Sequence, residues 1–185
     1  MSPRNTHTLF TSRLRLAPAA LEDVELLAGM RDGPGAPEAG HTERVRALVA
    51  ANTERFAAHG FGLWVVRASG EGRAGAAVGW IGLRPRESPL EPELLNGLSA
   101  ESRGKGFATE AAGAVLDRLF VAPAVTGVWA VTDPTNLASC RVLERLGMRL
   151  DFEGEFDGKP SRVYRLARDG WRDPRRTTAR GARRG

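Results

Sequence analysis

The chain has 185 residues, 42% of them hydrophobic, which is enough to form one domain with a full apolar core. Its formal charge of +5 comes from residues 174–185, which hold five arginines and no acid; without them, 22 basic residues face 22 acidic ones. We therefore expect a single neutral domain over residues 1–173, without a basic face for nucleic acid. Residues 174–185 are expected to be a disordered basic tail, either idle in solvent or in weak contact with RNA, ribosomes or another acidic surface.

No apolar run approaches the roughly 20 residues that span a bilayer, and the first residues lack the basic-then-apolar layout of a signal peptide. The single cysteine, Cys140, excludes an intramolecular disulfide and suits a reducing compartment. The sequence thus predicts a cytoplasmic protein without membrane contact, in which Cys140 is a small helix-packing residue rather than a nucleophile. A homodimer is left open.

Apolar periodicity predicts strands interleaved with helices along the whole chain. Strands are expected near residues 13–17, 62–68, 75–84, 92–99, 127–132, 148–156 and 161–167, and helices near residues 20–31, 42–58, 106–121 and 136–146. This alternation indicates an α/β or α+β fold.

Three segments between these elements are rich in turn-forming residues. Residues 32–40 predict a mobile loop, residues 69–73 a hairpin turn, and residues 85–92 a second loop. The helix at 42–58, which follows the first of them, is expected to bury one apolar stripe with a single amide among it: Val45, Leu48, Val49, Asn52 and Phe56.

A glycine-rich turn at residues 103–108 joins the strand at 92–99 to the helix that begins near Phe107. Such a turn presents free backbone N–H groups and the positive end of the helix dipole, so it predicts an anion site to which Arg103 and Lys105 add charge. The spacing matches neither G-x-G-x-x-G nor G-x-x-x-x-G-K-[ST]. A turn that merely needs glycine is the alternative. The helix itself is expected to carry Ala108, Ala112, Val115 and Leu119 on its apolar stripe, with Glu110, Asp117 and Arg118 off it.

A second motif covers residues 133–148 and follows the short apolar strand at Val128 to Val131. Asp133 and Pro134 end that strand, and a helix then carries an apolar stripe opposite charged residues. Gly147 is expected to close this helix in the left-handed conformation.

The two motifs, R-x-x-G-x-A at residues 103–108 and N-x-x-S-x-x-V-L-E-R-x-G at residues 136–147, resemble those of the GNAT (general N-acetyltransferase) superfamily. The order of the first strand and helix, and Glu93-Leu94 at the start of the strand before the glycine turn, resemble its subgroup of ribosomal-protein N-terminal acetyltransferases. The resemblance covers roughly residues 9–171. It implies a mixed, mostly antiparallel seven-stranded sheet flanked by about four helices, and direct acetyl transfer from acetyl-CoA to a primary amine in a ternary complex.

The resemblance also implies where acetyl-CoA binds. Its pantetheine arm is expected along Leu98, Ser99 and Ala100, and Asn136 is expected to contact that arm, although Asn136 could equally serve as a helix N-cap. The pyrophosphate is expected on the glycine turn: Arg103, Gly104, Lys105, Gly106, Phe107 and Ala108. No metal site is predicted.

The expected catalytic residues depart from one family pattern. Many members have a tyrosine where this chain has Leu143, so by resemblance to the ribosomal-protein subgroup Ser139 is the expected proton donor to the leaving thiolate. Glu93 is the expected base, acting through water. Each has an ordinary alternative: Ser139 could bond its own helix backbone, and Glu93 could form an ion pair at the rim of the site with an arginine.

Two histidines are alternatives to Glu93 by chemistry alone: His41, beside the loop at 32–40, could face substrate, whereas His59 more simply ends its helix. Trp80 is the tryptophan expected to contact substrate.

The sequence leaves the acceptor open, as a protein N-terminus or a small amine such as a drug, a polyamine or an amino acid. Two other functions stay open beside acetyl transfer. One is a non-catalytic acyl-CoA-binding or sensing domain, which the Leu143 departure favours and the presence of Glu93 and Ser139 disfavours. The other, an RNA-binding accessory protein, depends only on the tail.

Overall fold

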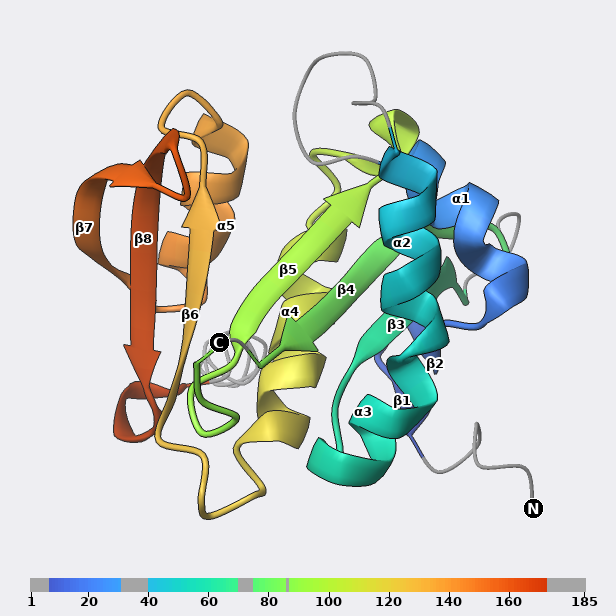
Figure 1. The fold of residues 1–185 in the computed structure, drawn as a ribbon, viewed down its shortest axis with the longest axis horizontal. Coiled ribbons are helices and arrows are strands. Elements are labelled where there is room, and N and C mark those ends of the chain that lie inside the picture. The colour runs from blue at the N-terminus through green and yellow to red at the C-terminus, as the bar shows by residue number, and fades with distance from the viewer. Residues whose placement is uncertain (1–6, 31–39, 70–74, 86, 173–185) are drawn as a thin grey trace, which may run out of the picture.

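A computed structural model describes residues 7–30, 40–69, 75–85 and 87–172. The expected loop at 32–40, the hairpin turn at 69–73 and the basic tail at 174–185 lie wholly or largely outside the described residues. Figure 1 shows the fold.

The described chain forms eight strands, five α-helices and three 3₁₀ turns. The strands are β1 Leu9–Phe10, β2 Leu14–Pro18, β3 Leu63–Ala68, β4 Ala77–Arg84, β5 Glu93–Leu98, β6 Gly127–Thr132, β7 Arg149–Phe156 and β8 Lys159–Ala167. The helices are α1 Val24–Gly29, α2 His41–Ala50, α3 Asn52–His59, α4 Phe107–Leu119 and α5 Leu137–Arg145. The 3₁₀ turns are η2 Leu21–Asp23, η3 Ala100–Ser102 and η4 Arg168–Gly170.

All eight strands belong to one sheet in the order β1-β2-β3-β4-β5-β6-β8-β7. Every neighbouring pair is antiparallel except β5 and β6. The mixed, mostly antiparallel fold predicted from the sequence is confirmed, with one strand more than expected. That strand, β1, has two residues, which is too short for an alternating pattern to reveal.

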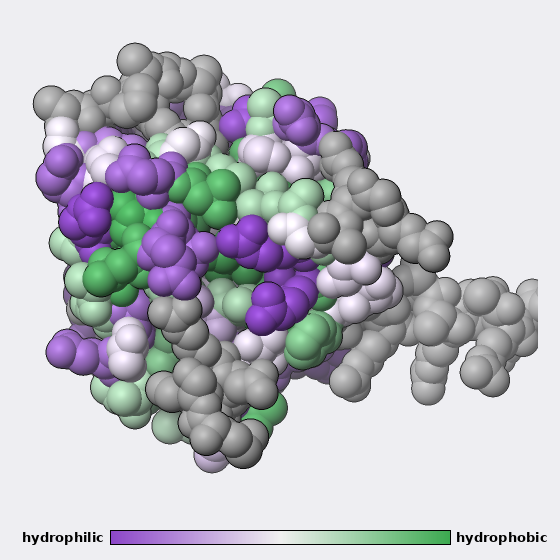
Figure 2. Space-filling view, turned by 90° about the vertical axis from the view of Figure 1, so that its right-hand side faces the viewer, coloured by the Kyte–Doolittle hydropathy of each residue, from purple (hydrophilic) through white to green (hydrophobic). Residues whose placement is uncertain are grey.

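The sheet separates two apolar cores. On one face, α4 and α5 cover the larger core, which includes Trp64, Ile81, Val115 and Leu116. On the other face, α1 and α2 cover a smaller core around Leu27 (Figure 1). The outer surface on this side of the molecule mixes hydrophilic and apolar residues (Figure 2), as expected for short helices that bury only one stripe.

The strands β5 and β6 part almost as soon as they meet. Their parallel ladder has a single residue pair, Glu93 with Trp129, anchored by the hydrogen bond from Trp129 N to the Pro92 carbonyl (3.2 Å). Beyond that point the two strands diverge toward their carboxyl ends (Figure 1). The backbone edge of β5 that faces β6 therefore lacks a ladder partner over Leu94–Leu98 in the described structure.

The single helix expected at residues 42–58 is instead two helices, α2 and α3, which meet at Ala51. The cause is the buried amide of Asn52, which is 1% exposed. Its Nδ2 donates to the Ala19 carbonyl (3.0 Å) and the Leu63 carbonyl (2.9 Å), and its Oδ1 accepts from Leu63 N (2.7 Å). The bend brings Asn52 and Phe56 onto the sheet, while Val45 and Leu48, expected to be buried, are only half-buried.

The helix expected at residues 20–31 is likewise shorter than its pattern suggested. It consists of η2 followed by the six-residue α1.

Replacing Asn52 tests this account of the bend. Asn52→Ala leaves two backbone groups, the Ala19 carbonyl and Leu63 N–H, without their hydrogen-bond partner, so we expect the free energy of unfolding to fall by about 2–4 kcal/mol. Urea denaturation followed by circular dichroism measures the change. The adjacent exposed substitution Thr53→Ala is the control and should cost about 0.5 kcal/mol or less. Equal losses for both variants would contradict the role of the amide.

Candidate functional site

The glycine turn opens α4 with an exposed N-terminus. Gly106 is the N-cap, with φ of 79°, and Gly104 has φ of 72°, both in the left-handed region that favours glycine. No side chain of the described residues caps the helix, and its first backbone bond is from Glu110 N to the Gly106 carbonyl (3.0 Å). The N–H groups before Glu110 are thus available to an anion.

The other residues of the turn are either charged and exposed or apolar and buried. Arg103 and Lys105 are exposed, whereas Phe107 and Ala108 pack into the protein. In the first turn of α4, Thr109 Oγ1 is buried without a hydrogen-bond partner among the described residues. An orphaned hydroxyl beside free N–H groups is suited to a phosphate-bearing ligand.

Arg13, which sequence reasoning missed, holds this turn in place. Its Nη1 donates to the Lys105 carbonyl (3.1 Å), and its guanidinium lies 4.8 Å from the centroid of the Phe107 ring. Glu110 in turn fixes Arg13 by accepting from its Nε (2.7 Å), and also accepts from Thr11 Oγ1. The turn at residues 11–13, between β1 and β2, therefore supports the anion site.

Glu110 corrects a prediction, because it was expected on the outer side of the helix and is 8% exposed. A glutamate in a helical pattern normally indicates a solvated position. Its partners lie almost 100 residues earlier in the sequence, and no local signal marks that contact. The correction matters because Glu110 lies within four residues of the glycine cap.

The strand β5 ends one residue earlier than expected, at Leu98. Of the three residues proposed to lie along the pantetheine arm, only Leu98 is in β5. Ser99 precedes η3, its Oγ donating to Ser102 Oγ (2.8 Å), and Ala100 begins that turn. The chain thus leaves the sheet at Ser99 and reaches the glycine turn within a few residues.

Helix α5 follows β6 in the chain and lies on the β6 side of the opening between β5 and β6 (Figure 1). Asn136 is its N-cap, with Oδ1 accepting from Ser139 N (3.1 Å), so the ordinary N-cap role exists here. Ser139 is half-buried one turn into the helix. Gly147 closes the helix with φ of 81°, as predicted. At the end of β6, Thr132 Oγ1 is a second buried hydroxyl without a partner in the described part of the chain.

Glu93 lies at the start of β5, 4% exposed, directly opposite Arg84 of β4. Its Oε2 accepts from both Nε (3.1 Å) and Nη2 of Arg84. The ion pair weighed as the alternative role for Glu93 is therefore present. The pair is not a rim contact, because the carboxylate is buried.

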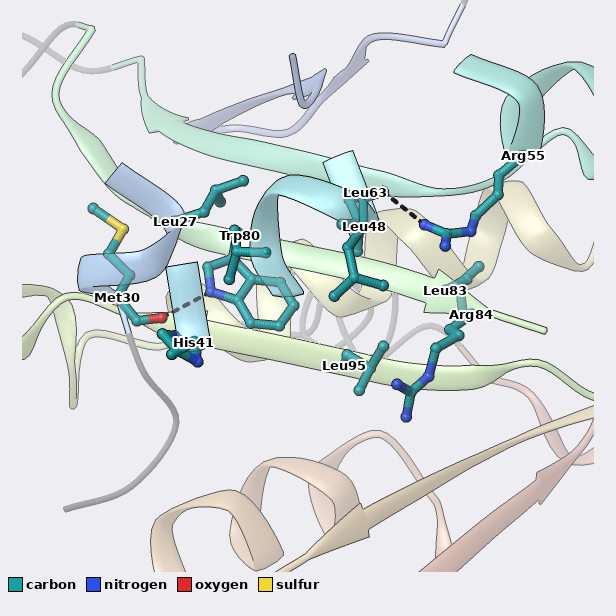
Figure 3. A pocket seen from close by; sticks show the side chains of 11 residues that line it. Leu27, Met30, His41, Leu48, Arg55, Leu63, Trp80, Leu83, Arg84 and Leu95 are labelled. Atoms are coloured by element: carbon teal, nitrogen blue, oxygen red, sulfur yellow. Dashed lines mark hydrogen bonds between the residues drawn. The ribbon is translucent and has the colours of Figure 1, made fainter. Parts of the chain in front are cut away.

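A pocket of about 240 Å³ lies between β4, β5 and the two helices α1 and α2, on the face of the sheet opposite α4 (Figure 3). The indole of Trp80, whose Nε1 donates to the Met30 carbonyl (2.8 Å), forms part of its wall. The buried Nε2 of His41 has no hydrogen-bond partner among the described residues. The complete lining is Leu27, Met30, His41, Val45, Leu48, Arg55, Leu63, Trp80, Leu83, Arg84 and Leu95.

Of the expected substrate contacts, Trp80 and His41 line this pocket, and His59 lies at the end of α3 before the left-handed Gly60. Arg55 and Arg84 also line it. Sequence reasoning missed them, since one arginine among 27 basic residues carries no distinguishing signal.

Comparisons with known proteins agree with this geometry. The chain matches the family model of the acetyltransferase (GNAT) domain over residues 13–149. It is 31% identical over 123 residues to the uncharacterized protein YkkB of Bacillus subtilis (strain 168), covering 65% of this chain and 70% of that protein. A solved GnaT-family protein of Bordetella pertussis is 25% identical with a TM-score of 0.71, covering 86% of this chain and 99% of that one. Mycobacterium smegmatis RimJ, solved with CoA-disulfide, is 20% identical with a TM-score of 0.65, covering 91% and 89%.

The chain belongs to the GNAT acetyltransferase family. Acetyl-CoA is the acetyl donor of this family, and the free N–H groups at α4 together with the orphaned Thr109 hydroxyl fit its phosphates. None of the described helices is long and apolar enough to traverse a bilayer.

The support that Glu110 gives to the turn depends on its charge. Burial by itself raises the pKa of the Glu110 carboxyl, but hydrogen bonds from Thr11 and Arg13, and the charge of Arg13, outweigh it and lower the pKa. A carboxyl with a lowered pKa in the folded state contributes its full stability above the ordinary glutamate pKa of about 4.3. That contribution disappears as the pH falls through the lowered pKa.

Glu110→Gln should therefore lower the melting temperature by roughly 3–8 °C at pH 7, and the difference from wild type should narrow as the pH falls below about 4. Differential scanning calorimetry across pH measures both effects. Glu155→Gln, at an exposed position of β7, should leave the melting temperature unchanged. A difference that stays constant down to pH 3 would refute the ionic part of the support.

Proposed function

We propose that this protein transfers the acetyl group of acetyl-CoA directly to a primary amine while both are bound. The observation that carries the proposal is that both sites adjoin the same strand. Leu98 ends β5 just before the turn that leads to the anion site, and Leu95 of β5 lines the apolar pocket. Three residues of a strand span about 10 Å, so a donor arm that enters beside Leu98 can present its thioester to an amine near Leu95.

Direct transfer needs no acyl-enzyme. Cys140, the cysteine of the chain, is 4% exposed and packs in the larger core, so it is a poor acyl carrier. The reaction then joins the amine nitrogen to the acetyl carbon and breaks the C–S bond. The amine gives up one proton and the CoA thiolate leaves.

The donor residues act by position and charge. The N–H groups of the turn from Arg103 to Ala108 bind the pyrophosphate, with charge from Arg103 and Lys105. Backbone groups of β5 on the edge that faces β6 bind the pantetheine arm as an added strand would, and Asn136 reaches the same arm. Its hydrogen bond with Ser139 N occupies one lone pair of Oδ1 and leaves its NH₂ group to donate.

For the proton transfers we propose Glu93 as the base, through water, and Ser139 as the donor to the thiolate. Glu93 begins β5, next to the pocket-lining Arg84, and its side chain is buried against that arginine. His41 competes for the base role, because its unpartnered Nε2 is buried at the pocket wall.

The acceptor is a protein N-terminus or a small amine. The alternative function, a domain that binds acyl-CoA without turnover, keeps the same donor site. Mixing the protein with acetyl-CoA and a panel of amines and following CoA release separates the two functions.

Gly106→Asp tests the donor site. The substitution places a carboxylate where the pyrophosphate meets the backbone, so we expect CoA affinity to fall by about tenfold or more. Titration calorimetry with CoA measures it. Gly158→Asp is the matched control, since Gly158 has a similar φ of 74° in the turn between β7 and β8. Unchanged CoA affinity in a folded Gly106→Asp variant would remove the turn from the site.

The base is tested by pH–rate profiles of three variants with one verified acceptor. If Glu93 is the base, Glu93→Gln should lower kcat/KM by about 10²-fold near neutral pH, and the loss should shrink as the pH approaches the pKa of the amine. Ser139→Ala should cost less, about tenfold, since a thiolate is a fair leaving group. His41→Gln should then leave the profile unchanged. The reverse pattern, with the loss in His41→Gln, would assign the base to His41.

A further inference from the structure

The pocket beside β5 is apolar in its middle and cationic at one end. Five leucines, each from a different helix or strand, line it (Figure 3): Leu27, Leu48, Leu63, Leu83 and Leu95. Arg55, from α3, and Arg84, from the end of β4, lie at the same end of the pocket, with their guanidinium groups on opposite sides of it. His41 and Met30 lie at the opposite end (Figure 3).

The positive charge at this end exceeds the negative charge. Arg84 is neutralised by Glu93. The guanidinium of Arg55 has no carboxylate partner among the described residues, and the one hydrogen bond it makes to them is from Nη1 to the Leu48 carbonyl (2.8 Å). A guanidinium has five N–H groups, so most of those on Arg55 are left for a ligand.

The environment of Arg55 is unfavourable to its charge. Burial lowers the pKa of Arg55, and the nearby charge of Arg84 lowers it further. An anion bound between the two arginines would relieve both effects, because it replaces lost hydration and offsets the like-charge repulsion.

Arg55 also has a structural task, since Leu48 lies in the last turn of α2 and its carbonyl needs a donor. That task uses one N–H group and does not require the guanidinium to line the pocket. This contact therefore explains where the Arg55 side chain lies, but it does not explain why the positively charged Arg84 lies at the same end of the pocket.

We propose, on the basis of the acetyl transfer inferred above, that the acceptor is a small primary amine with an apolar chain and a carboxylate at its far end. The carboxylate binds Arg55 and Arg84, the chain packs on the leucines, and the amine meets the thioester near Leu95. No carboxylate is among the described residues that line the pocket, and Glu93, outside the lining, is paired with Arg84, so a polycation such as a polyamine finds no matching charge there.

The strand register sets the length of this acceptor. Glu93, paired across to Arg84, lies two residues from Leu95 along β5, a distance of about 7 Å. An amine and a carboxylate joined to one carbon are too close together to span it. An ω-amino acid with an extended chain of several methylene groups fits.

Matched acceptors test the proposal. Initial rates of CoA release are measured with ω-amino acids of four, six and eight carbons and with the n-alkylamines of the same lengths. We expect 6-aminohexanoate to have a kcat/KM at least about tenfold above that of hexylamine, the usual size of a charge-assisted hydrogen bond. Arg55→Gln should raise the KM for 6-aminohexanoate by about tenfold with little change in kcat, and should not affect hexylamine.

Two variants control for damage to the fold. Arg55→Lys keeps a charge and the α2 contact, so it should retain part of the preference for the acid. Arg46→Gln, at an exposed arginine of α2 outside the pocket, should retain all of it. Melting temperatures of all three variants are measured alongside. Calorimetry of 6-aminohexanoate binding to the CoA-loaded wild type gives a readout that does not depend on turnover.

The possible outcomes distinguish failure of the carboxylate site from failure of the proposed acetyl transfer. Equal rates for acids and alkylamines, or acetylation of peptide N-termini alone, would overturn the carboxylate site and leave acetyl transfer intact. Absence of CoA release with every amine would overturn the function. In that case, binding of 6-aminohexanoate that weakens in Arg55→Gln would still support the site, and absence of such binding would overturn it too.

Discussion

The constraint on which the rest of this structure depends is the single residue pair between β5 and β6. A parallel connection needs a long crossover, and here α4 supplies it. Because β6 pairs fully with β8 on its other side, it is free to turn away from β5 after Trp129. A continuous ladder would have filled the edge of β5 with β6. The divergence leaves that edge, the turn that follows it and the start of α4 to bind a ligand.

Two ion pairs hold this opening in shape. At one side, Arg13 and Glu110 join the beginning of the chain to the glycine turn, so the anion site is fixed by more than its own backbone. At the other side, Arg84 and Glu93 join β4 to β5 where β5 begins. Each pair places a buried carboxylate against a partly exposed arginine, an arrangement in which removal of either partner leaves an uncompensated charge.

What could be predicted from the sequence is what local chemistry determines. The left-handed conformation of Gly147 follows from a helix C-terminus that requires positive φ, and the strands follow from alternation of apolar residues. The bend at Ala51 could not be predicted, because Asn52 fits a helical stripe and its partners lie on other elements. Glu110 and Arg55 were missed for the same reason: burial of a charged side chain depends on contacts across the fold. The roles of Glu93 and Ser139 rest on resemblance to the family.

The separation of the two cores by the sheet has a consequence for how such a protein can change. The donor turn is anchored in the larger core through Phe107, whereas the pocket is walled by α1 and α2 over the smaller one. Substitutions on opposite faces of a sheet share few partners, so their energetic effects are close to additive. On the site assignments proposed above, acceptor preference can therefore drift, or be redesigned, on one face while the affinity for the donor is inherited unchanged on the other.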